Sequence, residues 1–386
     1  MDYKLEGRDI LFDGEQLGPY PDHLLKRVDV PTNAIPEGKP RAKSRREKAK
    51  PLSEPEVRIG RTEPMFNAVG HVQRALESLS KMQNPVAEKQ APIPDDPRVR
   101  SRHIKSFAYF LGADMVGICE VPEYALYADD PAGNPVGRKY RYAIVLVKRQ
   151  DPKSTLASDG NDWIINACTH AAFVNLTCWS EALAYYIRRL GFEALGGSNR
   201  NGIGVMPSLL IAAGIGESGR LGIAVNPFFG ANYKSVAVMT NMELQPDKPI
   251  DFGLQEYCKT CGLCAQRCVS GAISRDNEII EYNGYAKYKF DYVRCATLQA
   301  NTKKGGSCGR CMLTCPWNRP DSTPGDFRDW DGDLKYLYDS VNARAAYLKE
   351  HDFVDEENSG KKWWFDLVEN EEGDLVIPEG SKYTLL

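Results

Sequence analysis

Four of the chain's eleven cysteines stand in the stretch Cys258-Lys-Thr-Cys261-Gly-Leu-Cys264-Ala-Gln-Arg-Cys268, at the spacing C-x2-C-x2-C-x3-C. Four more follow at the spacing C-x12-C-x2-C-x3-C, directly before a proline, at Cys295, Cys308, Cys311 and Cys315. Thiolates in two such blocks are the usual ligands of paired [4Fe–4S] clusters. Zinc sites normally show paired C-x2-C units, and disulfide frameworks belong to short secreted chains, so both alternatives fit these 386 residues less well.

The order of the cysteines predicts which of them share a cluster. In bacterial-type ferredoxins the fourth cysteine of each run ligates the other cluster, because the short loop that carries the first three wraps only three corners of one cubane. We therefore predict that one cluster is held by Cys258, Cys261, Cys264 and Cys315. The second cluster is then expected on Cys308, Cys311, Cys268 and Cys295.

Composition and charge exclude several classes of function. Hydrophobic residues make up 42% and charged residues 26% of the chain, which are ordinary values for a globular protein. The net charge of −3 provides no general attraction to nucleic acid or to an anionic membrane. No apolar run reaches the length of a membrane span, and the first residues lack the basic-then-apolar order of a signal peptide. We predict a cytoplasmic protein with no transmembrane segment and no nucleic-acid partner.

The chain divides into four predicted parts. Residues 1–97 are rich in proline and include a basic run at residues 39–50, so we predict a partly disordered N-terminal extension. Residues 98–245 are predicted to form an α/β domain, and residues 246–325 the two-cluster domain. Residues 326–386 are predicted to be a C-terminal tail that packs on the body through four aromatic side chains: Trp330, Trp363, Trp364 and Phe365.

Hydrophobic periodicity predicts the main elements of the α/β domain. We expect a helix over residues 100–111, a long helix from Asn161 or Asp162 to Gly191, and strands over residues 115–120, 142–148, 223–226 and 236–240. The apolar run at residues 142–148 indicates a strand buried on both faces. The long helix carries one apolar stripe: Ile165, Cys168, Ala172, Leu176, Trp179, Leu183 and Ile187. The cysteines outside the two blocks lie in apolar patterns and are predicted to be buried: Cys119, Cys168 and Cys178.

A glycine-rich segment, Gly214-Ile-Gly-Glu-Ser-Gly-Arg-Leu-Gly222, precedes one of the predicted strands. Four glycines in nine residues mean unusual backbone angles, as in a tight turn, or the close approach of another group. The segment also fits the pattern G-x-G-x-x-G of dinucleotide-binding folds. We discount NAD and FAD, because a strand follows directly and no helix N-terminus is available for the pyrophosphate.

The upstream domain indicates an enzyme rather than a bare ferredoxin. Iron–sulfur clusters pass single electrons, and a ferredoxin needs only the cysteine blocks and their surroundings. Here about 150 residues of α/β pattern precede the blocks and are joined to them by the short linker Pro246-Asp-Lys-Pro249. We infer a redox enzyme whose cofactor or substrate lies in the upstream domain.

Residues 191–316 resemble the cobalamin-dependent reductive dehalogenases. The resemblance is carried by both cysteine blocks, the ending Cys315-Pro-Trp-Asn318, and the segments Tyr186–Ala194, Ala213–Arg220, Asn226–Gly230 and Pro246–Gly253. It implies an α+β protein in which a nitroreductase-like, corrinoid-binding α/β domain is followed by a bacterial ferredoxin-like domain with two [4Fe–4S] clusters. It also implies a cobalamin bound base-off, with no protein histidine on cobalt.

The resemblance also gives the glycine-rich segment a role. A corrinoid is a flat macrocycle, and backbone without side chains can lie against it. We therefore expect the corrinoid to contact this segment and its neighbourhood: Gly202, Ser208, Gly214, Gly216, Gly219, Arg220, Gly222 and Phe229.

The reaction implied by the resemblance is the reductive removal of halide from an organohalide at reduced cobalt, with the clusters delivering electrons. The protein must then supply a proton to carbon and positive charge to the departing halide. Lys234 aligns with the basic residue of the family. The family's tyrosine is expected on the long helix, where this chain has Phe173. We predict His170 as the substitute proton donor, with Tyr233 as a weaker candidate.

The expected partners are a small organohalide and an external ferredoxin or flavodoxin, because the sequence shows no reductase domain. The identity of the organohalide, the cobalt mechanism and the oligomeric state are not predicted. Two alternative functions stay open. An epoxyqueuosine reductase-like enzyme acting on tRNA would share the corrinoid, the clusters and the Cys-Pro-Trp-Asn ending, although the linker and the short x12 gap count against it. A non-catalytic iron–sulfur electron-transfer protein would explain the departure at Phe173.

Overall fold

The computed structural model describes residues 26–27, 68–76, 78, 85–128, 130, 134–136, 138–158, 160, 164–199, 202–282, 285–301, 307–319, 334–351, 368–369, 371–372 and 375–376. Within these residues no helix is both long enough and apolar enough to cross a membrane. Several predictions lie outside the described residues. They concern the basic run at residues 39–50, the cap at Asn161 or Asp162, and the four aromatic residues of the tail, Trp330, Trp363, Trp364 and Phe365.

The fold is built on a four-stranded antiparallel sheet in the order β2-β3-β7-β4. The strands are β2 (Met115–Glu120), β3 (Tyr142–Arg149), β4 (Ala194–Leu195) and β7 (Tyr233–Thr240). In the central strand, Ile144 lies opposite Ile118 of β2 on one side and Val238 of β7 on the other. The predicted strands at residues 115–120 and 142–148 are confirmed, and β7 begins three residues before the predicted strand.

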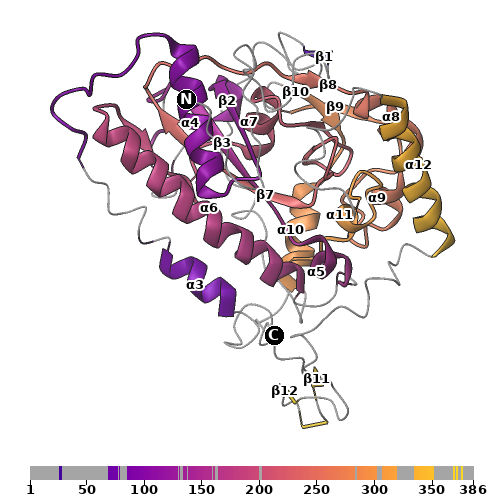
Figure 1. Cartoon of the computed structure of the whole chain (residues 1–386). Helices are drawn as coiled ribbons and strands as arrows, with labels where there is room; N and C mark the ends of the chain where they lie inside the picture. Colours follow the sequence, from indigo (N-terminus) through magenta and orange to yellow (C-terminus); the bar gives the residue numbers. More distant parts are fainter. Residues whose placement is uncertain are drawn as a thin grey trace.

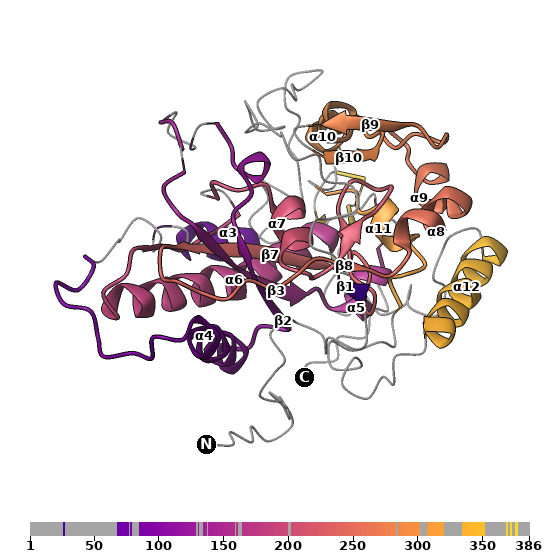
Figure 2. The same cartoon turned by 90° about the horizontal axis from the view of Figure 1, so that it is seen from above.

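The sheet is covered on both faces, because side chains alternate along each strand and both sets are apolar. On β3, Ile144 and Leu146 join the core beneath α4 (Pro97–Leu111) and α6 (Ile164–Arg189). The alternate side chains of β3 join the core that includes α7 (Met206–Ala212). Figure 2 shows α4 and α7 on opposite sides of the strands. The prediction that this central strand is buried on both faces is confirmed.

Helix α4 begins and ends at residues with clear capping roles. The Asp96 side chain accepts a hydrogen bond from the backbone N–H of Arg98, and Pro97 occupies the first turn, where its missing N–H costs nothing. Gly112 ends the helix with a φ of 113°, a conformation that favours glycine. The helix therefore begins three residues earlier than the sequence pattern predicts.

Helix α6 carries the predicted apolar stripe. Six of the seven stripe residues are buried, and Trp179 is partly buried against the same core. The prediction that Cys178 is buried is wrong, since it is exposed. It follows the buried Leu176 by two residues, or about 200° around the helix, and so faces away from the sheet. Cys119 and Cys168 are buried, as predicted.

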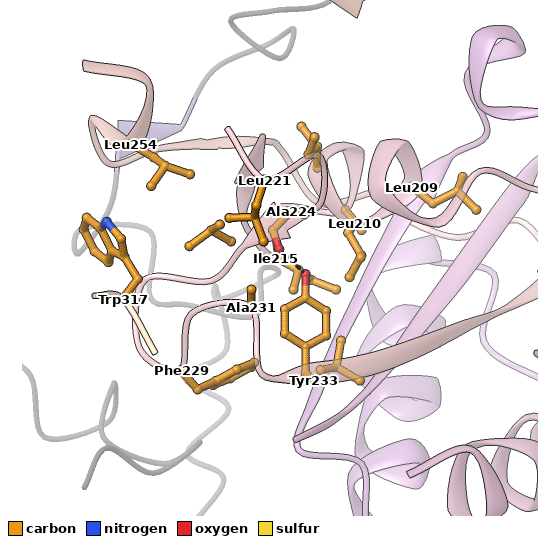
Figure 3. Packing of buried hydrophobic residues seen from close by; sticks show 14 of the residues in the cluster. Leu209, Leu210, Ile215, Leu221, Ala224, Phe229, Ala231, Tyr233, Leu254 and Trp317 are labelled. Carbon is orange, nitrogen blue, oxygen red and sulfur yellow. Dashed lines mark hydrogen bonds between the residues drawn. The ribbon is translucent and has the colours of Figure 1, made fainter. Parts of the chain in front are cut away.

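The cysteine blocks lie on short helices beside the sheet, on the right of Figure 1. These elements are α8 (Leu254–Cys261), α9 (Leu263–Gln266), α10 (Tyr292–Asn301) and α11 (Arg310–Leu313), with the hairpin β9 (Ile279–Tyr282) and β10 (Tyr285–Tyr288) and the helix α12 (Leu334–Glu350). The core on the α7 face of the sheet continues into this part, where it includes Leu254, Trp317 and Val341. Figure 3 shows this continuity from Leu209 to Trp317. The sheet and the cysteine helices thus share one hydrophobic core.

Shorter elements complete the described part of the chain. They are η2 (Glu123–Ala125), α5 (Pro152–Leu156), β5 (Glu217–Ser218), β6 (Ala224–Val225), β8 (Ile250–Asp251), β11 (Val368–Glu369) and β12 (Leu375–Val376). Two pieces of the predicted N-terminal extension take part in the fold. β1 (Lys26–Arg27) pairs with β8, and α3 (Ala68–Leu76) contacts α6.

The predicted linker is fixed to the sheet by a buried ion pair. Lys105 Nζ of α4 lies 2.6 Å from Asp247 Oδ1, and the two side chains are 2% and 0% exposed. The second carboxylate oxygen accepts the backbone N–H of Ile118 at 2.7 Å, and the Asp247 N–H donates to the Ile118 carbonyl at 2.7 Å. Satisfied in this way, the buried charges hold the start of the cysteine region against β2.

Loss of one partner of this pair should destabilise the fold strongly. A Lys105→Met substitution leaves the Asp247 carboxylate buried without its cation, which costs about 3–5 kcal/mol in the free energy of unfolding. Lys335→Met serves as the control, because its ion pair with Asp339 is exposed and contributes about 1 kcal/mol or less. Denaturant unfolding of both variants measures the difference. Equal losses in the two variants would contradict this assignment.

Candidate functional site

The first cysteine group consists of Cys258, Cys261, Cys264 and Cys315, which line one cavity together. Helix α8 carries two of these cysteines, and Gly262, at a φ of 63°, turns the chain directly into α9, which carries the third. Cys315 comes from the second block, just after α11. The turn at Gly262 and the return of the chain at α11 therefore bring four thiols from two distant stretches around the same space.

The second cysteine group consists of Cys268, Cys295, Cys308 and Cys311, all partly exposed. The charges of the other three members contribute to a raised pKa of Cys311, which places the four thiols close together. Polar side chains contact three of the sulfurs: Ser270 Oγ lies 3.4 Å from Cys268, Gln299 Nε2 3.5 Å from Cys295, and Arg310 Nη1 3.6 Å from Cys308. Cys264 of the first group also raises the pKa of Cys311, so the two groups are neighbours.

Burial holds the thiols of the first group in their protonated form when nothing binds them. It raises the pKa of Cys258 to about 11 and that of Cys264 to about 12, and the charges of neighbouring thiols add to the effect. Bound metal reverses this by deprotonating a coordinating thiol. Among the described residues, no three His, Cys, Asp or Glu side chains converge on the position of a single metal ion.

Aromatic rings enclose one side of the first cysteine group. Trp317, which is 1% exposed, lies edge-on to Phe252, Tyr257 and Tyr338, with ring centroids 4.9, 5.7 and 5.5 Å away. The Tyr257 hydroxyl forms a hydrogen bond with the Cys261 thiol, and Trp317 and Tyr257 both line the cavity. These rings therefore cover the sulfurs on that side.

The glycine-rich segment forms the tight hairpin β5–β6. Its glycines pack on atoms of the protein itself: a Cβ added to Gly216 would lie 2.3 Å from the Val225 carbonyl oxygen, and one added to Gly222 would meet the Phe290 ring at 2.9 Å. Gly214 and Gly222 also have positive φ angles of 69° and 81°. The hairpin therefore requires glycine at these positions for its own folding, which is the tight-turn interpretation that the sequence left open.

A second cavity lies between the end of β4 and the strand β7. Its lining is rich in backbone and small residues, and consists of Leu195, Gly196, Gly197, Ser198, Gly202, Ile203, Gly204, Met206, Val236, Ala237 and Met239. Gly202 has room for a side chain, since an added Cβ would meet only the Ser198 carbonyl oxygen, at a van der Waals distance of 3.8 Å. Nearby on α7, Ser208 is buried and its hydroxyl has no hydrogen-bond partner among the described residues.

The residues expected to contact a corrinoid do not all lie together. Gly202 lines the second cavity, whereas Arg220 lines the cavity of the first cysteine group. Phe229 is fully buried and packs edge-on against Tyr233, with ring centroids 5.6 Å apart (Figure 3). The remaining expected contacts are Ser208 on α7 and four glycines of the β5–β6 hairpin, Gly214, Gly216, Gly219 and Gly222.

The three candidate catalytic residues occupy different surroundings. Tyr233 is buried, and its hydroxyl donates a hydrogen bond to the Ala224 carbonyl at 2.8 Å, as Figure 3 shows. Lys234 follows it on β7, so its side chain points to the opposite face of the sheet, which α6 covers. His170 lies on α6 with its Nδ1 3.2 Å from Gln73 Oε1 of α3.

Contacts of Gln150 show that Lys234 and His170 occupy the same end of the sheet. The Gln150 backbone N–H donates to the Asn232 carbonyl at 3.0 Å, just before β7 begins. Its side-chain Nε2 lies 3.4 Å from Thr169 Oγ1, one residue before His170. The first half of α6 therefore lies beside the start of β7, although the His170 side chain itself contacts α3.

Four polar or aromatic residues near the first cysteine group were missed by the sequence analysis. Tyr257 precedes Cys258 and Trp317 follows Cys315 by two residues, so adjacency to the cysteines was an available signal. Glu217 and Tyr338 had no such signal, because their contacts join segments far apart in the chain. Glu217 accepts the backbone N–H of Phe252 just before α8, and the Tyr338 hydroxyl donates to the Phe252 carbonyl at 2.8 Å.

Glu217 should make the stability of the protein depend on pH. Burial raises its pKa from 4.5 to about 7, although backbone N–H groups before and at the start of α8 oppose the shift. Between these pH values the folded protein keeps a proton that the unfolded chain has released, so this carboxyl's contribution to stability falls as pH rises. The free energy of unfolding of wild type minus that of Glu217→Gln should therefore fall by about 3 kcal/mol between pH 4.5 and pH 7.

Denaturant unfolding at a series of pH values tests this expectation. Glu256→Gln, which removes an exposed carboxylate from α8, is the control. A difference between wild type and Glu217→Gln that stays constant with pH would show that the carboxyl titrates alike in the folded and unfolded states.

Comparison with known proteins identifies the family of the chain. No protein-family model matches the chain. The chain is 28% identical over 282 residues to the tetrachloroethene reductive dehalogenase of Sulfurospirillum multivorans, a match that covers 63% of this chain and 55% of that protein. It is 31% identical over 273 residues to the corresponding enzyme of Dehalobacter restrictus, which covers 58% and 48%. A match to the epoxyqueuosine reductase of Synechocystis is shorter, at 28% identity over 124 residues.

Solved structures agree with the sequence comparison. The catabolic reductive dehalogenase NpRdhA superposes with a TM-score of 0.78 at 30% identity, over 94% of this chain and 53% of that chain. A reductive dehalogenase structure described in terms of B12-dependent dehalogenation gives 0.79 at 30% identity, over 94% and 54%. The chain spans about half the length of these relatives. By sequence and by fold, it belongs to the reductive dehalogenase family.

Proposed function

We propose that the protein removes halide reductively from a small organohalide, at a corrinoid fed by two [4Fe–4S] clusters. The observation that carries the proposal is the pair of neighbouring cysteine groups, each drawing thiols from both blocks, in a chain of the reductive dehalogenase family. Cys258, Cys261, Cys264 and Cys315 would hold the first cluster, and Cys268, Cys295, Cys308 and Cys311 the second. Backbone N–H groups of Arg220 and Trp317 donate to Cys258 and Cys315, a common feature of cluster ligands.

We place one edge of the corrinoid beside the second cavity. Gly202 leaves room there for another group, and the buried Ser208 hydroxyl nearby has no hydrogen-bond partner among the described residues. Gly197 and Gly204 instead pack on atoms of the protein itself. We propose that the corrinoid is bound base-off, with no protein histidine on cobalt. When bound, the corrinoid supplies the reduced metal that breaks the carbon–halogen bond.

We place the residues that act on the substrate beside the start of β7. Lys234 provides positive charge for the departing halide, and His170 provides a group able to transfer a proton near neutral pH. Tyr233 is less suited, because its hydroxyl is committed to the Ala224 carbonyl and burial raises its pKa further. NpRdhA has been solved with 3-bromo-4-hydroxybenzoic acid, which supports an organohalide as the substrate class here. A ferredoxin or flavodoxin is the proposed electron donor.

Replacement of Lys234 should slow halide release. In anaerobically reconstituted protein supplied with cobalamin and a strong one-electron donor, Lys234→Ala should lower kcat about 10²–10³-fold, as expected when a group that stabilises developing charge is removed. Lys139→Ala, an exposed lysine, is the control. Halide release from a panel of aryl and alkyl halides is the measurement. Unchanged kcat in Lys234→Ala would remove this residue from the mechanism, and the absence of bound corrinoid would contradict the proposed function.

Serine variants test how the two blocks share the clusters. Cys268→Ser should disturb the same cluster spectrum as Cys308→Ser, although Cys268 belongs to the first block. Cys315→Ser should instead disturb the spectrum that Cys261→Ser disturbs. Electron paramagnetic resonance of the reduced proteins separates the two signals, with Cys178→Ser as the control because Cys178 is exposed on α6. If Cys268→Ser and Cys261→Ser affected the same cluster, each block would hold its own.

A further inference from the structure

Arg220, in the glycine-rich segment, has an unusual position for an arginine. Its side chain is buried, with 2% exposure. The guanidinium donates to the Cys258 carbonyl from Nε at 3.1 Å and from Nη2 at 2.8 Å, and to the Ser274 carbonyl from Nη1 at 3.2 Å. It also bonds the Asp276 carbonyl and the Asn277 side chain. The group is thus fixed in place by neutral oxygen atoms.

An aromatic ring completes the surroundings of this cation. The guanidinium carbon of Arg220 lies 4.4 Å from the centroid of the Tyr288 ring on β10. In the part of the chain that the structure describes, no carboxylate forms an ion pair with it. Asp276 is exposed, and its carboxylate accepts from the Ser274 hydroxyl and the Glu278 N–H instead. The exposed Asp276 carboxylate acts on the guanidinium only from a distance. A buried cation at this position is therefore costly unless further negative charge lies beside it.

The first cysteine group would supply that negative charge once it binds a cluster. Arg220 lines the same cavity as the four thiols, and its backbone N–H donates to Cys258. The guanidinium is held on the Cys258 carbonyl and lines the same cavity as Cys261, Cys264 and Cys315, so its charge lies beside all four expected ligands. A cluster with four thiolate ligands gains a further negative charge on reduction, which a fixed neighbouring cation stabilises.

We propose that Arg220 is a positioning residue that raises the reduction potential of the cluster bound by Cys258, Cys261, Cys264 and Cys315. This inference rests on the proposed function, since it requires a cluster at that site. It assigns the glycine-rich segment to the cluster rather than to a corrinoid: the β5–β6 hairpin places a cation beside the sulfurs. The second cysteine group is different, because Arg310, the cation that contacts it, is only partly buried and so is screened by water.

A redox titration followed by electron paramagnetic resonance tests the inference on the full chain after anaerobic reconstitution. In Arg220→Gln, the ratio of reduced to oxidised first cluster at a fixed potential should fall about tenfold, which equals about 59 mV for one electron. The second cluster should titrate as in wild type. Arg220→Lys keeps the charge and should remain near the wild-type potential. Arg275→Gln replaces an exposed arginine in the segment before β9, and it should change the reduction potential of neither cluster.

Each outcome decides the inference. A first cluster that assembles in Arg220→Gln with an unchanged potential would overturn it, as would a potential in Arg220→Lys as low as that in Arg220→Gln. If Arg220→Gln loses the first cluster, an assembled Arg220→Lys with wild-type potential supports the role of charge. Loss of that cluster in both variants assigns Arg220 a structural role and contradicts the inference. Wild-type protein without iron and sulfide would instead contradict the proposed function itself.

Discussion

The placement of four sulfurs in a buried space is the constraint on which this structure depends. Water stabilises thiolates, and the first cysteine group is largely removed from it by Trp317 and the rings around it. Backbone N–H groups donate to Cys258 and Cys315, and the proposed role of the Arg220 cation adds positive charge beside them. The hairpin geometry, the glycines within it and the Glu217 contact before α8 all serve to bring these groups to the sulfurs.

The same core also connects the sulfurs to the sheet. Apolar residues run without interruption from β3 and α7 to Leu254 and Trp317, and the buried pair of Lys105 and Asp247 holds the start of the cysteine region on β2. This pair and the shared core connect the cysteine groups to the sheet that carries the cavity beside β4 and the side chains at the start of β7. The proposed electron transfer from the clusters to a corrinoid would use this connection.

The strands and the long helix could be predicted because each buries side chains at a regular period within a short stretch, as β3 and α6 do. The position of Arg220 could not be predicted, since its partners lie 38 to 57 residues away. In addition, a glycine-rich segment has the same sequence pattern whether it forms a tight turn or binds a ligand. Cys178 shows a related limit: an apolar sequence around a helix does not tell which residue faces the sheet. Spacing predicted that Cys315 joins the earlier block, and in the structure its thiol lines the cavity of Cys258.

The iron, sulfide and corrinoid content of the reconstituted protein tests the central claim most directly. After anaerobic reconstitution with iron, sulfide and cobalamin and removal of unbound material, each chain should retain about eight iron atoms, eight sulfides and one corrinoid, the content of two [4Fe–4S] clusters and one cobalt cofactor. Chemical analysis and the visible spectrum measure all three. Retention of about four iron atoms, or of clusters without any corrinoid, would contradict the arrangement of two clusters serving a corrinoid in one chain.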